Sequence, residues 1–337
     1  MTMKLWRSHS LTDATASLQR LLAGALPELP TPQLPLPHLK SPKKPRQSAA
    51  PAQGRFLDQS YAGSHGKYTY KLYIPSGYRG QPVPLIVMLH GCTQSADDFA
   101  AGTRMNEAAE AQTCLVAWPQ QVQSANLQKC WNWFRQVDQQ RDSGEPSVIA
   151  GITRQVMGEY AVDHRRVYIA GLSAGGAAAA IMGETYPDLY AAVGVHSGLP
   201  CGAARDLSSA LAVMRHGSNG IIPQAGSGMP PTIVFHGDGD TTVHPANGDA
   251  VVAQAAAGNG WRARQQDGSV RGGHAWRRTQ YFDQDGMLKI EHWLVHSAGH
   301  AWSGGNSQGS FTDPQGPDAT AAMMRFFLAH PREHAVA

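Results

Sequence analysis

The segment 166–182, RVYIAGLSAGGAAAAIM, constrains the fold of this chain more than any other stretch. It begins with a short apolar run that is typical of a buried parallel strand. It then passes through Gly-Leu-Ser-Ala-Gly into an alanine-rich stretch that predicts a helix. A strand, a G-x-S-x-G turn and a helix in this order indicate a nucleophile elbow, where small neighbours let strand and helix approach closely. We therefore predict that Ser173 is a catalytic nucleophile at the edge of a sheet.

Strands and helices alternate along the rest of the chain. We expect strands at 68–74, 84–88, 114–118, 191–195, 232–235, 275–282 and 287–295, and helices at 97–112, 147–160 and 318–328. Alternation at this spacing predicts an α/β protein with a mostly parallel central sheet and helices on both faces. Together with the elbow, it indicates the α/β-hydrolase fold.

The first 54 residues differ from the remainder in composition. Leucines at helical spacing predict a short amphipathic helix within 11–26, and the proline-rich stretch 26–51 predicts an extended linker. We expect residues 1–54 to form this helix and linker, and residues 55–337 to form one catalytic domain. The N-terminus shows no long apolar core and no clear cleavage site of a secretory signal, which favours a cytoplasmic location.

Charge and hydropathy exclude several classes of partner. The net charge is +3, and the basic residues form no stripe, so we expect no nucleic-acid partner. No window reaches the apolar length of a membrane span, so we expect no membrane partner. The four cysteines contain no C-x-x-C pair, and no cluster of ligands has metal-site spacing, so we expect neither a metal nor another cofactor. The sequence leaves the oligomeric state open.

A nucleophilic serine needs a base, and the base needs an acid that orients it. In this fold the acid follows a strand after the elbow, and the histidine follows the last strand. Asp238 and Asp240 compete for the acid position after the strand at 232–235; we favour Asp240 because it lies further into the loop. His300, on a glycine-flanked loop after the strand at 287–295, is the predicted base. His296 is expected to be a packed residue within that strand.

A tetrahedral oxyanion also needs preformed N–H donors. One expected donor is the backbone amide of Ala174, directly after the nucleophile. The other is expected in the loop His90-Gly91-Cys92-Thr93, which follows the strand at 84–88. We predict the Cys92 N–H for this role, with Thr93 as the alternative.

Two features point to the substrate. The stretch Cys130-Trp131-Asn132-Trp133-Phe134 is unusually aromatic, and we expect Trp131, with Trp302 beside the base, to form an apolar wall of the binding site. The alternative is that these rings anchor the loop to the core. The segment 200–231 is predicted to be irregular. We expect it to be either a lid over the site or a solvated loop.

These motifs resemble those of the poly(3-hydroxybutyrate) depolymerase-like esterases, which are related to feruloyl and acetylxylan esterases. The resemblance runs from Tyr68 to Leu328 and rests on LHGCTQ (89–94), CWNWF (130–134), GLSAGG (171–176), VHSGLP (195–200), HGDGDTTVHPANGD (236–249) and GHAWSGG (299–305). It places the family's nucleophile, acid and base on Ser173, Asp240 and His300. It implies hydrolysis of short-chain hydroxyalkanoate esters through an acyl-enzyme, with a small ester or a polyester oligomer as substrate. It also implies a Cys92–Cys130 disulfide; a pair of buried free thiols is the alternative.

Secreted members of that family carry a signal peptide and a separate polymer-binding domain, neither of which is visible in this sequence. We therefore expect soluble oligomers or small esters as substrates, rather than crystalline polymer. An extracellular location, as in the secreted members, is the alternative to a cytoplasmic one. Two other functions stay open: a feruloyl or acetylxylan esterase, and a non-catalytic binding protein on a hydrolase scaffold.

Overall fold

The computed structural model describes residues 54–218, 229–256 and 259–332. The chain divides into the units Met1–Ala50 and Pro51–Ala337, and all of the described residues belong to the second unit. The helix expected within 11–26 and the proline-rich linker lie outside the described residues. The division at residue 54 therefore stays a prediction.

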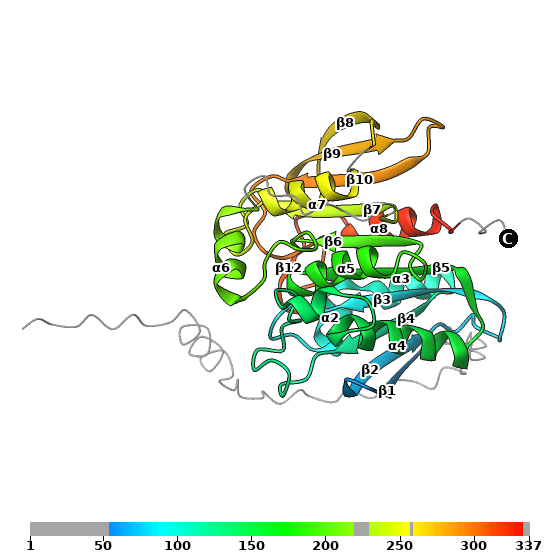
Figure 1. The fold of residues 1–337 in the computed structure, drawn as a ribbon. Coiled ribbons are helices and arrows are strands. Elements are labelled where there is room, and N and C mark those ends of the chain that lie inside the picture. Colours follow the sequence, from blue (N-terminus) through cyan, green and yellow to red (C-terminus); the bar gives the residue numbers. More distant parts are fainter. Residues whose placement is uncertain (1–53, 219–228, 257–258, 333–337) are drawn as a thin grey trace, which may run out of the picture. The chain divides into compact units, whose positions relative to one another are not determined.

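A ten-stranded sheet runs through the described part of the chain in the order β1-β2-β4-β3-β5-β6-β7-β10-β9-β8 (Figure 1). Its strands are β1 (Arg55–Gly63), β2 (Gly66–Ile74), β3 (Val83–Leu89), β4 (Leu115–Gln120), β5 (Val162–Leu172), β6 (Ala192–His196), β7 (Thr232–Gly237), β8 (Arg262–Ser269), β9 (Ala275–Phe282) and β10 (Leu288–Val295). From β4 to β10 in this order neighbouring strands are parallel, and the pairs at both edges are antiparallel. The predicted α/β fold with a mostly parallel sheet is confirmed.

Helices cover both faces of the sheet, and each face has its own core. The helices are α2 (Ala96–Thr103), α3 (Met105–Gln112), α4 (Gly144–Glu159), α5 (Ala174–Thr185), α6 (Leu207–His216), α7 (Ala246–Ala256) and α8 (Ala319–Leu328). In β3, Leu85, Val87 and Leu89 pack with α4, α5 and α7, whereas Ile86 and Met88 pack with α2, α3 and α8. This alternation follows from the two-residue period of a strand, and it makes β3 fully buried.

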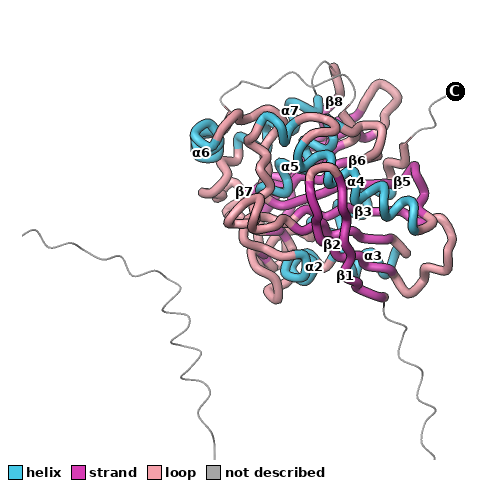
Figure 2. The backbone as a smooth tube through the Cα atoms, turned by 60° about the horizontal axis from the view of Figure 1, so that its bottom comes forward, coloured by secondary structure: helices cyan, strands magenta, loops and turns pink. Residues whose placement is uncertain are grey.

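Three short elements complete the described part of the chain. They are a 3₁₀ helix η1 (Gln136–Gln139) and the short strands β11 (Trp302–Ser303) and β12 (Thr312–Asp313). Figure 2 shows the β1–β2 hairpin beside α4, with which β1 is in contact. Of the helices in the described residues, none combines the length and hydrophobicity that a membrane crossing needs.

Two predicted segments differ from the structure. The helix expected at 97–112 is two helices, because Arg104 adopts a left-handed conformation with φ 55° and ends α2. The segment 200–231, expected to be irregular, contains α6. The carboxylate of Asp206 accepts a hydrogen bond from the N–H of Ser209, and the Ser209 hydroxyl bonds back to the Asp206 backbone, so a capping box starts this helix.

Candidate active site

Ser173 lies on the sharp turn between β5 and α5. Its backbone has φ 59° and ψ −120°, a region that a non-glycine residue occupies only when the surrounding structure holds it there. Its N–H donates to the His196 carbonyl at 2.9 Å, which extends the pairing of β5 with β6 into the turn. Ser173 is therefore fixed at the end of the parallel strands and at the N-terminus of a helix.

Two glycines of the elbow allow strand and helix to approach each other. A Cβ atom on Gly175 would lie 2.0 Å from the Leu89 carbonyl oxygen, and one on Gly171 would lie 2.2 Å from the Gly175 carbonyl oxygen. Both contacts are with backbone, which cannot turn away as a side chain can. The turn therefore requires glycine at both positions.

His300 and Asp240 form a buried hydrogen-bonded pair. The Nδ1 atom of His300 lies 2.7 Å from Oδ2 of Asp240, and the side chains are 11% and 0% exposed. Oδ1 of Asp240 accepts the N–H groups of Thr242 and Val243, both at 2.9 Å. Burial favours the neutral acid, but hydrogen bonds from His236, His300 and the Val243 N–H outweigh it and hold the pKa of Asp240 below its ordinary value. An ionised Asp240 only accepts, so Nδ1 of His300 carries a proton, and in the neutral tautomer that this bond selects the lone pair lies on Nε2.

Asp238 has a different partner. Its Oδ2 lies 2.8 Å from Nδ1 of His296, and its Oδ1 accepts the N–H of Ser297 at 2.6 Å. Both side chains are more than a third exposed. His296 was predicted to lie within the last strand, but it follows the end of β10 at Val295. Of the two aspartates that the sequence offered, Asp240 is the one hydrogen-bonded to His300.

Ser173, His300 and Cys92 line the same small cavity, which has a volume of about 240 Å³. Within the described part of the chain, no hydrogen bond joins Ser173 to His300. Such bonds are often long in unliganded enzymes and shorten when substrate binds. The cavity brings a serine, a histidine whose Nδ1 is held by Asp240 and a loop of backbone donors to one place.

The loop after β3 is held in a way that directs the Cys92 N–H. The Gly91 carbonyl lies 2.7 Å from Nδ1 of His90, and Nε2 of His90 accepts the Gln121 N–H at 3.1 Å. The ring proton therefore sits on Nδ1 and is donated to Gly91. In a trans peptide the C=O and the following N–H point in opposite directions, so binding the Gly91 oxygen turns the Cys92 N–H away from His90.

The alternative donor, Thr93, is engaged elsewhere. Its N–H donates to the Gln128 carbonyl at 2.6 Å. The Cys92 N–H forms no hydrogen bond with any of the described residues, and Cys92 lines the cavity that contains Ser173. This arrangement favours Cys92 over Thr93 as the second oxyanion donor, beside Ala174.

A disulfide joins Cys92 to Cys130, with an S–S distance of 2.06 Å, and confirms the predicted pairing. The two cysteines are 38 residues apart. By the loop-entropy relation, closing a loop of this length stabilises the folded state by about 4 kcal/mol. The disulfide therefore connects the candidate donor loop to the aromatic stretch 130–134.

A buried carboxylate holds that aromatic stretch from the other side. Glu145 on α4 accepts hydrogen bonds from the backbone N–H of Asn132, the side-chain amide of Asn132 and the side-chain amide of Gln121. Burial raises the pKa of Glu145 to about 7, and the hydrogen bonds from Asn132 and Gln121 oppose that rise. Gln121 also donates to His90, so one network supports both the donor loop and the aromatic stretch.

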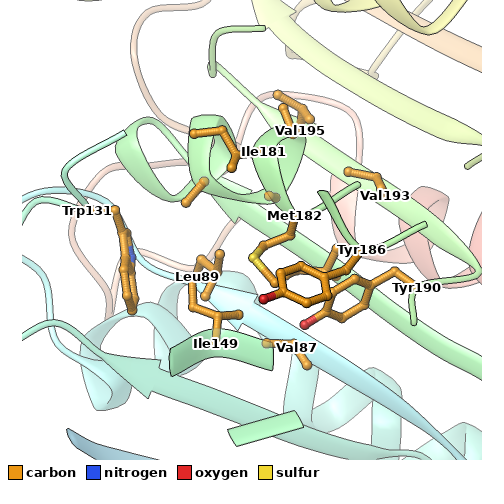
Figure 3. Close-up of a cluster of buried hydrophobic side chains, with 14 of the residues drawn as sticks. Val87, Leu89, Trp131, Ile149, Ile181, Met182, Tyr186, Tyr190, Val193 and Val195 are labelled. Atoms are coloured by element: carbon orange, nitrogen blue, oxygen red, sulfur yellow. The ribbon is translucent and has the colours of Figure 1, made fainter. Parts of the chain in front are cut away.

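The aromatic wall differs from the one we expected. Trp131 is 0% exposed and packs in the core with Leu89 and Ile149 (Figure 3). Trp302 is 1% exposed, and its indole N–H donates to Thr320. Neither ring lines the cavities at Ser173. Instead, Trp133 and Phe134 line a larger cavity of about 860 Å³ that also contains Ser173, Cys92 and Ala174.

The model of the protein family described as "Esterase PHB depolymerase" matches residues 68–280. The poly(3-hydroxyalkanoate) depolymerase C of Paucimonas lemoignei is 31% identical over 239 residues, which are 68% of this chain and 57% of that protein. The chain belongs to the esterase PHB depolymerase family.

Further relatives and one solved structure are less similar to this chain. The poly(3-hydroxybutyrate) depolymerase of Ralstonia pickettii is 27% identical over 68% of this chain and 49% of its own length. The acetylxylan esterase A of Emericella nidulans is 27% identical over 53% of this chain and 63% of its own length. An acetyl xylan esterase structure from Aspergillus awamori covers 82% of this chain and 100% of its own, with a TM-score of 0.62 and 18% identity, and supports the fold alone. The chain spans about half the length of the curated relatives it matches first.

The structure adds residues to this candidate site that the sequence did not indicate. Gln128 and Met214 line both cavities at Ser173. Met214 lies on α6, which the sequence did not predict, and Gln128 lies in a loop without periodicity. The one available signal was the aromatic stretch 130–134, which lines the larger cavity through Trp133 and Phe134 and not through Trp131.

His90 predicts a pH dependence of the stability of this protein. Burial lowers its pKa from 6.5 to about 4. Between pH 4 and pH 6.5, His90 binds more protons in the unfolded chain than in the folded one. The contribution of neutral His90 to the free energy of unfolding is therefore complete above pH 6.5 and is lost as the pH falls toward 4. The full contribution is about 3 kcal/mol, at 1.36 kcal/mol per pKa unit. Between pH 7.5 and 4.5, the unfolding free energy in urea should fall by about 2–3 kcal/mol more in the wild type than in His90→Gln. Equal losses in both proteins would contradict this assignment.

Proposed function

We propose that this protein is a serine carboxylester hydrolase that acts through an acyl-enzyme on short-chain hydroxyalkanoate esters and oligomers. One observation carries the proposal. A histidine that is hydrogen-bonded through Nδ1 to an ionised, buried aspartate shares a cavity with a serine on a nucleophile elbow. Membership of the esterase PHB depolymerase family supports the same reaction class.

In the proposed mechanism, Ser173 Oγ attacks the ester carbonyl while Nε2 of His300 takes its proton. Asp240 keeps the imidazole in the required tautomer and stabilises the imidazolium that forms. The N–H groups of Cys92 and Ala174 stabilise the oxyanion. As the tetrahedral intermediate collapses, His300 returns the proton to the alcohol oxygen and Ser173 is left acylated. Water, activated by His300, then releases the acid.

The proposed substrate class rests on the relatives and on the cavity. Two of the relatives are named as depolymerases of poly(3-hydroxyalkanoates) or poly(3-hydroxybutyrate). The larger cavity is lined mainly by apolar side chains, which suits an aliphatic ester chain better than a sugar.

A second candidate is an acetylxylan or feruloyl esterase. Acetylxylan esterases are among the relatives, and Trp133 and Phe134 line the larger cavity, where a phenolic ring would meet aromatic side chains. Comparing kcat/KM for 3-hydroxybutyrate oligomers, methyl ferulate and acetylated xylan separates these substrates.

A fluorophosphonate probe tests the reaction class. The probe forms a covalent bond with an activated serine, so we expect one adduct per chain, located by peptide mass spectrometry at Ser173. The same protein should hydrolyse p-nitrophenyl butyrate, and the labelled protein should not. If the native protein shows neither labelling nor hydrolysis, the result would favour the alternative hypothesis of a non-catalytic binding protein on a hydrolase scaffold.

A further inference from the structure

Two cavities of unequal size meet at Ser173. Their volumes are about 860 and 240 Å³, and both are lined by Cys92, Gln128, Ser173 and Met214. The nucleophile therefore lies at the junction of the two spaces, not at the end of one. An ester bound there has its reacting carbonyl at Ser173, with its acyl part in one cavity and its alcohol part in the other.

The remaining lining residues distinguish the two cavities chemically. His300 lines the smaller cavity, together with Thr242 and Phe311, and does not line the larger one. Ala174, whose N–H is a proposed oxyanion donor, lines only the larger cavity. His300, the proposed proton donor, thus borders only the smaller cavity and Ala174 only the larger one, while Cys92, the other proposed oxyanion donor, borders both.

This difference fixes which part of the ester enters each cavity. The leaving alcohol oxygen has to receive its proton from His300, so the alcohol lies on the His300 side. The acyl group stays attached to Ser173 with its oxygen toward the Ala174 N–H. We propose, on the basis of the function proposed above, that the enzyme selects esters with a large apolar acyl group and a small alcohol.

The size and walls of the cavities support this orientation. At about 30 Å³ per small non-hydrogen group, taken from the liquid volume of water, the smaller cavity holds roughly eight such groups and the larger one roughly thirty. One wall of the larger cavity is a face of α6, formed by residues at positions i, i+3, i+4 and i+7: Leu207, Ala210, Leu211 and Met214. Trp133 and Phe134 supply aromatic surface to the same cavity.

Hydrogen bonds at both ends of α6 hold this helix in place as a wall of the larger cavity. Its N-terminus has the capping box at Asp206. Near its C-terminus, the carbonyl of Met214 accepts the N–H of His244 at 2.8 Å, and the carbonyl of Val213 accepts the side-chain amide of Asn247 at 2.9 Å. The acyl selectivity should therefore respond to the volume of side chains on this helix. Acetylated xylan is the opposite kind of ester, because its acyl group is small and its alcohol is bulky.

Isomeric esters test the orientation. Methyl heptanoate and hexyl acetate have the same composition and differ only in the position of the ester group. We expect kcat/KM to be at least about tenfold higher for methyl heptanoate, which corresponds to about 1.4 kcal/mol in the activation free energy. Leu211→Trp, which fills part of the larger cavity, should lower the ratio of kcat/KM for methyl heptanoate to that for methyl butyrate about tenfold.

Met287→Trp is the matched control, because Met287 is also about half exposed but lines neither cavity. This variant should leave the ratio unchanged. Equal or faster hydrolysis of hexyl acetate, or an unchanged ratio in Leu211→Trp, would overturn the orientation and leave the esterase proposal standing. If neither isomer is hydrolysed and Ser173 is not labelled by a fluorophosphonate, the proposed function itself fails, and the orientation fails with it.

Discussion

Replacing Ser173 with alanine is expected to lower kcat/KM for p-nitrophenyl butyrate by at least about 10⁴-fold, because the acyl-enzyme cannot form without the hydroxyl. The residual rate should be that of water attack assisted by the proposed oxyanion donors, the N–H groups of Cys92 and Ala174. Fluorophosphonate labelling should disappear completely. Retained turnover or labelling would show that another residue is the nucleophile.

The structure also indicates that this variant will fold. Alanine at 173 has the same strained φ of 59° as serine, so the backbone cost is unchanged. The hydrogen bond from the residue 173 N–H to His196 does not involve the side chain. The melting temperature should therefore stay within a few degrees of wild type. Ser64→Ala, in the exposed turn between β1 and β2, is a matched control that should keep full activity.

The residues of the candidate triad were predictable because their positions follow from local motifs and a topological rule. The G-x-S-x-G motif fixes the turn by itself, since backbone atoms exclude a Cβ at Gly171 and Gly175. The carboxyl ends of parallel strands meet at one edge of a sheet, so loops after β7 and β10 had to approach the elbow. That rule needs only the order of the strands.

The substrate-binding walls were not predictable in the same way. Trp131 and Trp133 lie in a loop, where no period relates sequence position to side-chain direction; both rings are buried, and only Trp133 lines the larger cavity. The start of α6 depends on a capping box within a segment rich in glycine and serine. Strand β8 is exposed along nearly its whole length at the sheet edge, so it lacks the apolar alternation that indicates a strand.

The two aspartates after β7 offer the second large effect and an internal control. In Asp240→Asn, the carbonyl oxygen can keep the N–H bonds from Thr242 and Val243, which places the amide NH₂ against Nδ1 of His300. An amide donor there forces the ring proton onto Nε2, where it blocks acceptance of the serine proton. We expect kcat/KM to fall by about 10³–10⁴-fold, by analogy with the effect of the same substitution in serine proteases.

Asp238→Asn makes the same chemical change two residues away, where the carboxylate binds His296 and the Ser297 N–H outside the two cavities. This variant should change kcat/KM by less than about threefold, although it loses an exposed histidine–aspartate pair worth at most about 1 kcal/mol of stability. Both proteins should keep fluorophosphonate-accessible Ser173, but only Asp240→Asn should label slowly, since labelling also requires the base. A loss of activity in Asp238→Asn as large as that in Asp240→Asn would mean that the pair Asp238–His296 takes part in the chemistry and that the candidate triad is incorrectly assigned.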